Sequence, residues 1–171
     1  MPLHMKAWEF ARKKLNAQFD YEFFFSKKGM KEKDIVQVYN QKFNCHLDES
    51  DVETAKHQYF TNNISSAKSI DPVVALVKNY KDILPMSVVS GGTRKNIIKE
   101  LQIVRIDSHF KIILTADDHL KPKPAPDLFL EAARLMNVEP RYCQVFEDGD
   151  LGLEAAVNAG MIATDVRPFL L

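Results

Sequence analysis

Apolar side chains recur every three or four residues through roughly the first 80 positions of the chain. Two stripes of this kind are Trp8, Ala11, Leu15 and Phe19, and then Ile35, Val38, Tyr39 and Phe43. Such spacing gathers the apolar residues on one face of an α-helix. The pattern therefore predicts helices, and no strand, between Met5 and about Tyr80.

The pattern changes after Asp71-Pro72, a pair that is typical of a helix start. Short apolar runs then alternate with helical segments. The runs predicted to be strands are 84–89, 110–115, 142–146 and 161–166. Helices fit at 127–136 and at 151–159, where Gly160 ends the second one. This alternation predicts an α/β fold with a Rossmann-like parallel sheet covered by helices on both faces.

Composition and charge exclude several classes of protein. The 171 residues carry 23 basic and 23 acidic side chains, so no net field favours nucleic acid or an anionic membrane. No apolar run approaches the ~20 residues that span a bilayer, and no signal-peptide pattern is present. Cys45 and Cys143 lack zinc-type or CxxC spacing and are predicted to be reduced thiols. We therefore expect a soluble, cytoplasmic protein with neither a nucleic-acid nor a membrane partner.

Two adjacent carboxylates, Glu147 and Asp148, follow the predicted strand 142–146. They would lie at the carboxyl edge of the sheet, where open α/β folds bind ligands. Oxygen ligands of this kind suit Mg²⁺. The alternative is an ordinary turn, with Asp150 as a helix N-cap and Glu147 in solvent.

Two further segments are candidates for phosphate binding. The Ser90 hydroxyl and the backbone N–H groups of Gly91 and Gly92 would stand at a helix start and could hold a phosphate oxygen, although ordinary turns have the same composition. Arg94 could assist there or be a surface charge. Three prolines within positions 122–126 stiffen the loop around Lys123, which favours a fixed ammonium over a solvated one.

Together these segments resemble the haloacid-dehalogenase-like hydrolases. Ser90, KPAPD with Lys123, and VFEDGDLGLEAAVNAGM resemble the second, third and fourth motifs of that family. The resemblance is greatest to the subgroup of β-phosphoglucomutase and fructose-1-phosphate phosphatase-like enzymes. It implies that residues 1–75 form a helical cap with a hinge at its start, and that residues 76–171 form the α/β core.

The resemblance also implies roles for individual residues. Ser90 would hydrogen-bond the transferring phosphoryl group, and Lys123 would neutralise it. Glu147 and Asp148 would hold Mg²⁺ directly or through water. Three further residues are expected to bind substrate: Gly91, His4 and Gly29. For His4 the alternative is a surface or capping role, and for the lysines around Gly29 it is a solvated face.

One motif of the family is absent. In the family the first strand ends in DxDGT, whose first Asp attacks phosphorus and whose second Asp is the general acid and base, and no DxDGT occurs in the 171 residues. We therefore expect that the first, central strand is missing from between the strand ending at Ser90 and the strand ending at Phe146. The chain as given is expected to be truncated and inactive, with unpaired strand edges prone to self-association.

Three functions remain open. The favoured one, for the intact parent, is Mg²⁺-dependent hydrolysis of a small sugar phosphate such as fructose 1-phosphate through an aspartyl-phosphate. The others are an isomerase of the β-phosphoglucomutase type and a non-catalytic remnant. A dinucleotide-binding protein is disfavoured, because Ser90-Gly91-Gly92 lacks the GxGxxG spacing.

Overall fold

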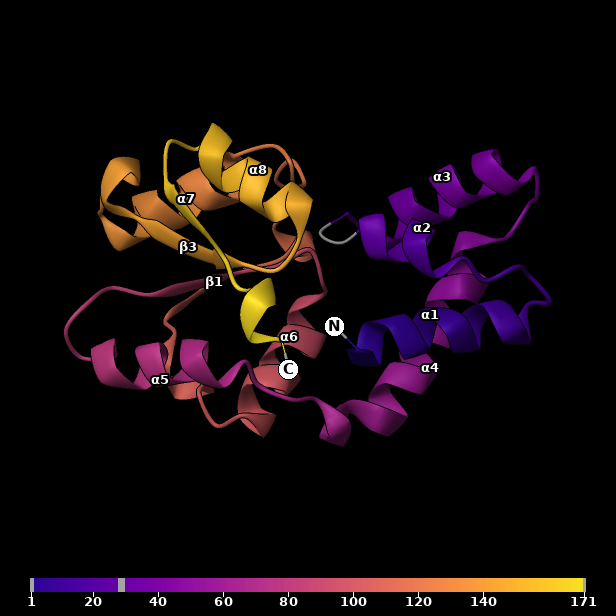
Figure 1. Ribbon diagram of the computed structural model, residues 1–171, viewed down its shortest axis with the longest axis horizontal. Helices are drawn as coiled ribbons and strands as arrows, with labels where there is room; N and C mark the ends of the chain where they lie inside the picture. Colours follow the sequence, from indigo (N-terminus) through magenta and orange to yellow (C-terminus); the bar gives the residue numbers. More distant parts are fainter. Residues whose placement is uncertain (1, 28–29, 171) are drawn as a thin grey trace.

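The computed structural model describes residues 2–27 and 30–170. Helices occupy the first part of the chain, as its apolar stripes predict: α1 (Pro2–Lys14), α2 (Tyr21–Ser26), α3 (Glu32–Phe43), α4 (Glu49–Asn63) and α5 (Asp71–Tyr80). α1 packs along α4 and against α2, and α3 packs on α4. Figure 1 shows these first four helices at one end of the molecule and the strands at the other. The described residues up to Tyr80 contain no strand, as predicted.

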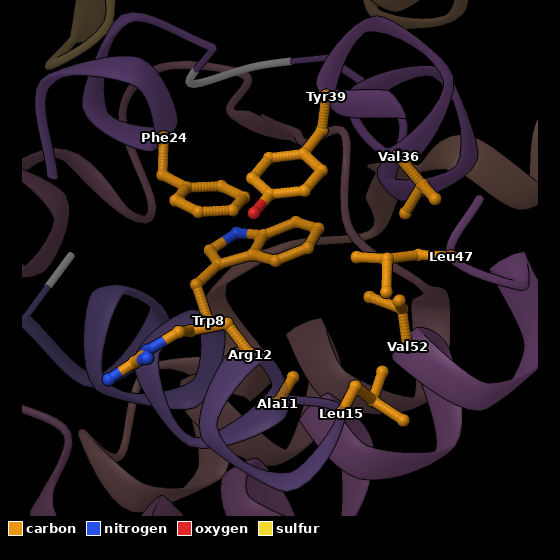
Figure 2. Close-up of a pocket in the computed structure, with 9 residues that line it drawn as sticks. All are labelled: Trp8, Ala11, Arg12, Leu15, Phe24, Val36, Tyr39, Leu47 and Val52. Atoms are coloured by element: carbon orange, nitrogen blue, oxygen red, sulfur yellow. The ribbon is translucent and has the colours of Figure 1, made fainter. Parts of the chain in front are cut away.

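Aromatic rings fill the interior of the helical part. Trp8 on α1 stacks on Phe24, with 4.7 Å between ring centroids, and Phe24 stacks on Tyr39 at 5.6 Å. Figure 2 shows the three rings facing one another, with aliphatic side chains closing the far side. The Tyr39 hydroxyl donates to the Gln18 carbonyl oxygen at 2.5 Å. A void of about 10 Å³ remains among these residues, which is room for one water at most.

Four short strands are present: β1 (Ser87–Val89), β2 (Ile112–Leu114), β3 (Gln144–Glu147) and β4 (Ile162–Asp165). Three lie within the predicted runs, and β3 overlaps the predicted run 142–146 but ends one residue beyond it. β1 pairs with β2 and β3 pairs with β4, both in parallel as predicted. Within the described residues no ladder joins the two pairs. The strands therefore form two separate halves of a sheet, which we call the β1–β2 half and the β3–β4 half.

Helices lie on both sides of the strands: α6 (Arg94–Ile103), α7 (Asp127–Met136) and α8 (Asp150–Asn158). α7 packs on the β1–β2 half and α8 on the β3–β4 half. In Figure 1, α7 and α8 lie on one side of β1 and β3, and α5 and α6 on the other. The apolar face predicted for α7 is buried through Phe129, Ala132 and Ala133. Asp150 is the first residue of α8 and Gly149 its N-cap, so the prediction of Asp150 as the cap was wrong by one position.

Short 3-10 turns complete the chain: η1 (Ile64–Ser66), η2 (Asp107–His109), η3 (Ala116–Asp118), η4 (Pro140–Tyr142) and η5 (Arg167–Phe169). No helix in the described part of the chain has the length and apolarity needed to cross a membrane.

Two places leave apolar surface uncovered. α5 begins at Asp71-Pro72 as predicted, yet none of its residues is buried. Ile83, just after α5, is 70% exposed, and Phe146 on β3 is 39% exposed although it belongs to a strand. A strand residue flanked by helices is normally covered on both faces, so the exposure of Phe146 marks the open side of the β3–β4 half.

Candidate active site

A cleft of about 380 Å³ lies between the helical part and the ends of the strands, a size typical of small-molecule sites. Six of the expected site residues line it: His4, Ser90, Gly91, Lys123, Glu147 and Asp148. The seventh, Gly29, lies outside the described residues. Residues predicted from separate segments therefore meet around one cavity.

Lys123 is held in place at the floor of this cleft. Its side chain is buried, with Nζ 2.5 Å from Oε2 of Glu147, and Nζ also donates to the Val89 carbonyl oxygen at 3.4 Å. The ring centroid of Phe129 lies 5.0 Å from Nζ. Val89 ends β1 and Glu147 ends β3, so one ammonium group joins the carboxyl ends of the two halves. A solvated lysine, the alternative from the sequence, is wrong.

Glu147 is equally well fixed. Its Oε1 accepts hydrogen bonds from the backbone N–H groups of Asp148 and Gly149, at 3.0 and 3.1 Å, while its Oε2 meets Lys123. Gly152 lies directly against this carboxyl group, and a Cβ atom added at Gly152 would overlap it. The glycine thus makes room for a largely covered carboxylate that is hydrogen-bonded at both oxygens, and the alternative of a solvated Glu147 is wrong.

The carboxylates alone do not complete a magnesium site. The described residues contain no group of three or more His, Cys, Asp or Glu side chains arranged to hold a metal ion. Glu147 faces Lys123 and the backbone, and Asp148 lines the same cleft. Mg²⁺ bound by so few carboxylates would keep most of its water.

Ser90 continues the β1–β2 ladder and opens the loop before α6. Its N–H donates to the Leu114 carbonyl oxygen at 2.9 Å, and its Oγ accepts from the Gly92 N–H at 3.1 Å. The hydroxyl oxygen is thereby fixed, while its hydrogen can still donate to a ligand. Thr93 is the N-cap of α6, so the loop leads into a helix N-terminus, which favours anions.

Arg94 has a structural partner outside this group. Its guanidinium donates to both carboxylate oxygens of Asp118, at 2.8 and 2.9 Å. Asp118 also accepts from the N–H and the hydroxyl of Thr115, at 2.7 and 3.0 Å. Burial alone would raise the pKa of Asp118, but the Thr115 hydrogen bonds and the Arg94 charge outweigh burial and lower that pKa. Arg94 is thus tied to η3 and not directed to a phosphate.

His4 contributes to the opposite wall. Its Nε2 lies 3.2 Å from Oε1 of Glu100 on α6, and its ring stacks on Phe60 with 4.8 Å between centroids. The contact with Glu100 connects α1 to the strand-bearing part of the molecule. A substrate contact by His4 stays a prediction.

The comparison with protein families decides the classification. The family model described as haloacid dehalogenase-like hydrolase matches residues 3–166 of this chain. The chain belongs to this family.

Two relatives in this haloacid-dehalogenase-like family match nearly the whole chain. An uncharacterized protein of Haemophilus influenzae is 34% identical over 98% of this chain and 84% of its own length. Fructose-1-phosphate phosphatase YqaB of Escherichia coli is 33% identical over 97% of this chain and 88% of its own length.

Solved structures agree in fold. β-Phosphoglucomutase from Clostridium difficile matches with a TM-score of 0.80 at 25% identity, over 96% of this chain and 77% of that one. A hydrolase from Pseudomonas syringae gives the same TM-score of 0.80 at 19% identity, over 96% of this chain and 77% of that one, and this likeness concerns the fold alone.

The structure adds residues that the sequence patterns did not indicate. On the helical side these are Glu32 and Lys56, which line the cleft of this family member beside Trp8 of the predicted apolar stripe and Lys27 of the lysines around Gly29. Lys56 is buried and forms an ion pair with Glu32. One signal was available, because Lys56 stands at helical spacing between the buried residues Val52 and Phe60. A charge in the middle of an apolar stripe marks a position with a specific partner.

Proposed function

We propose that this chain carries the cap and the phosphate-binding groups of a Mg²⁺-dependent phosphatase of small sugar phosphates. The observation that supports it best is the buried Lys123 at the ends of both sheet halves, in one cleft with Ser90. A phosphate there would meet an ammonium group, a hydroxyl donor and the loop before α6. These groups counter charge on the equatorial oxygens of a transferring phosphoryl group.

The attacking carboxylate, in this proposal, belongs to a DxDGT strand that is not among the 171 residues. Glu147 is a poor nucleophile because Lys123 and two backbone N–H groups hold it. The unjoined edges of β1 and β3 leave a place for another strand. Asn96 supports this, because its buried Oδ1 lines the cleft without a hydrogen-bond partner in the described residues, and an added chain could supply the donor.

Ser90 and Lys123 then each have a defined task. Ser90 donates its hydroxyl hydrogen to a phosphoryl oxygen, and Lys123 shares its protons between Glu147 and a second oxygen. The helical part covers the cleft and limits the access of water. Mg²⁺ would add positive charge beside Asp148, but the donor set present does not complete its site, and the tasks of Ser90 and Lys123 stand without it.

The phosphatase is preferred over a mutase because of the extent of similarity. The phosphatase of Escherichia coli matches 97% of this chain, helical part included. A β-phosphoglucomutase of Bacillus subtilis is 36% identical over only 44%. We therefore take fructose 1-phosphate as the first substrate to test. A mutase, or a remnant without activity, is the alternative.

The experiment restores the missing strand. The chain as given should release no phosphate from fructose 1-phosphate above background, whereas the chain extended by an N-terminal strand ending in DxDGT should do so with Mg²⁺. In the extended protein, Lys123→Ala should cost at least ~10²-fold in turnover, as for the loss of one charge-stabilising group. Lys121→Ala, at an exposed position of the same loop, should leave turnover unchanged. Turnover by the unextended chain that disappears in Asp148→Ala would place the nucleophile among these residues.

A further inference from the structure

The cap wall of the cleft carries a closed ion pair of its own. Lys56 on α4 is 4% exposed, pairs with Glu32 at the start of α3, and places Nζ 5.0 Å from the ring of Trp8. All three residues line the cavity that Lys123 lines from the other side. Each end of the cleft thus carries a lysine–glutamate pair, and we call them the phosphate end at Lys123 and the cap end at Lys56. At the phosphate end the Glu147 carboxylate is also held by two backbone N–H groups, whereas the Glu32 side chain at the cap end is more exposed.

The pair faces the cavity, which sets it apart from a purely structural one. Glu32 keeps 35% of its side chain exposed while Lys56 is almost fully covered. An ammonium group has three donors and a carboxylate has about four acceptor positions, so their mutual contact leaves both with capacity to bind a ligand. A hydrogen bond from a ligand to a charged group is stronger where little water surrounds that group than in bulk solvent.

We propose that the Lys56–Glu32 pair recognises the uncharged, hydroxyl-bearing end of the substrate and disfavours a second phosphate there. Neighbouring hydroxyl groups match the pair, because each can donate to Glu32 and accept from Lys56. A second phosphate would lie beside the Glu32 carboxylate, and like charges brought together in a desolvated site are strongly unfavourable. The inference rests on the proposed function in one respect, that the first phosphate occupies the Lys123 end.

The ammonium group of Lys27 would attract a second phosphate and so acts against the preference for a single phosphate. It lines the same cleft, and its Nζ lies 5.8 Å from the ring of Phe23. Lys27 is less buried than Lys56, so its ammonium group keeps more of its water. Its pull on a second phosphate should therefore be weaker than the repulsion by Glu32.

Trp8 allows a binding test that needs no turnover. It is the single tryptophan of the chain and its ring lies against Lys56, so its fluorescence reports a ligand at the cap end. Fructose 1-phosphate, fructose 1,6-bisphosphate and free fructose would be titrated into the chain as it exists, with inorganic phosphate as a competitor. We expect the monophosphate to bind about tenfold more tightly than the bisphosphate, as for one unfavourable charge contact.

Glu32→Gln keeps the shape of the side chain and removes its charge. It should abolish that preference by tightening bisphosphate binding about tenfold, with competition by inorganic phosphate unchanged. Lys27→Met is the matched control and should not remove the preference for the monophosphate. Equal binding of both sugars by the wild type, or a Glu32→Gln variant that keeps the preference, would overturn the inference.

Failure of the proposed function gives a different result. If inorganic phosphate does not compete, the Lys123 end is not a phosphate site. Free fructose then still tests the pair, because it should change Trp8 fluorescence in the wild type and not in Lys56→Met. A thermal melt of each variant shows whether it is folded, and a response to fructose that persists in folded Lys56→Met would overturn the inference.

Discussion

Replacement of Gly152 by alanine tests the geometry around Glu147 through two opposing effects. In an exposed helix, Gly→Ala stabilises by about 1 kcal/mol because glycine loses more backbone entropy on folding. Here the new methyl group would overlap the Glu147 carboxyl group. That side chain would have to move, and its contacts with Lys123, Asp148 and Gly149 would weaken.

The second effect should dominate. A buried donor left without its partner costs about 1–3 kcal/mol, and charged groups cost more. Lys123 is buried, so displacement of Glu147 leaves its ammonium group with the Val89 carbonyl as the remaining hydrogen-bond acceptor that the structure gives it. For a neutral donor, subtraction of the helix gain would leave about 0–2 kcal/mol. Because the Lys123 ammonium group is charged, we expect Gly152→Ala to lower the free energy of unfolding by about 2 kcal/mol or more, measured by urea denaturation.

A double-mutant cycle separates the overlap from any general effect on α8. In a Glu147→Ala background the carboxyl group is gone, so Gly152→Ala should be neutral or stabilising by up to about 1 kcal/mol. Destabilisation of equal size in both backgrounds would refute the assignment of the cost to Glu147. A Gly152→Ala chain more stable than the wild type would refute the packing itself.

Three further predictions follow from the site and the strands. Titration calorimetry should give Mg²⁺ a millimolar or weaker dissociation constant, because few carboxylates are available; a micromolar site would contradict the incomplete donor set. The pKa of Asp118 is lowered from its ordinary 3.8, so its contribution to stability is complete above that pH and is lost as the pH falls through the lowered value. Asp118→Asn should therefore flatten the acid limb of a stability-against-pH curve, and an unchanged limb would argue against the Thr115 and Arg94 contacts. The unjoined edges of β1 and β3 should make the chain alone self-associate and bind a hydrophobic dye, whereas a monomeric, cooperatively melting chain that binds no dye would contradict this.

The sequence predicted the elements better than their contacts. Each of the four strands falls on a predicted run, with β3 ending one residue beyond its run, because short apolar segments between turn residues leave few other local structures. Ser90 and Glu147 were placed at strand ends by the same reasoning, since every parallel strand delivers its following residues to one edge, whereas Lys123 was predicted from its proline-rich loop and the family resemblance. Their direct contact was not predicted, because it depends on side-chain geometry across the gap between the two halves.

Contacts made by the helical part show the same limit. Trp8 belongs to a stripe that predicted burial, and it is buried. The Lys56–Glu32 pair and the His4–Glu100 contact join residues far apart in the chain, and no periodicity encodes such partners. Lys56 was not predicted as a site residue for a further reason. Lysine is normally exposed, and the partner of Lys56 belongs to a different helix.

The position of Lys123 has a consequence for how this protein can change. One ammonium group fastens the β1–β2 half to the β3–β4 half and also faces the ligand cavity. In the proposed phosphatase, a mutation that turned Lys123 further toward the phosphate would loosen the junction, and one that tightened the junction would withdraw charge from the cavity. Affinity and rigidity therefore cannot be tuned separately at this position, and adaptation to a new substrate has more freedom at the cap end, where a change of side chain leaves the framework of the strands intact.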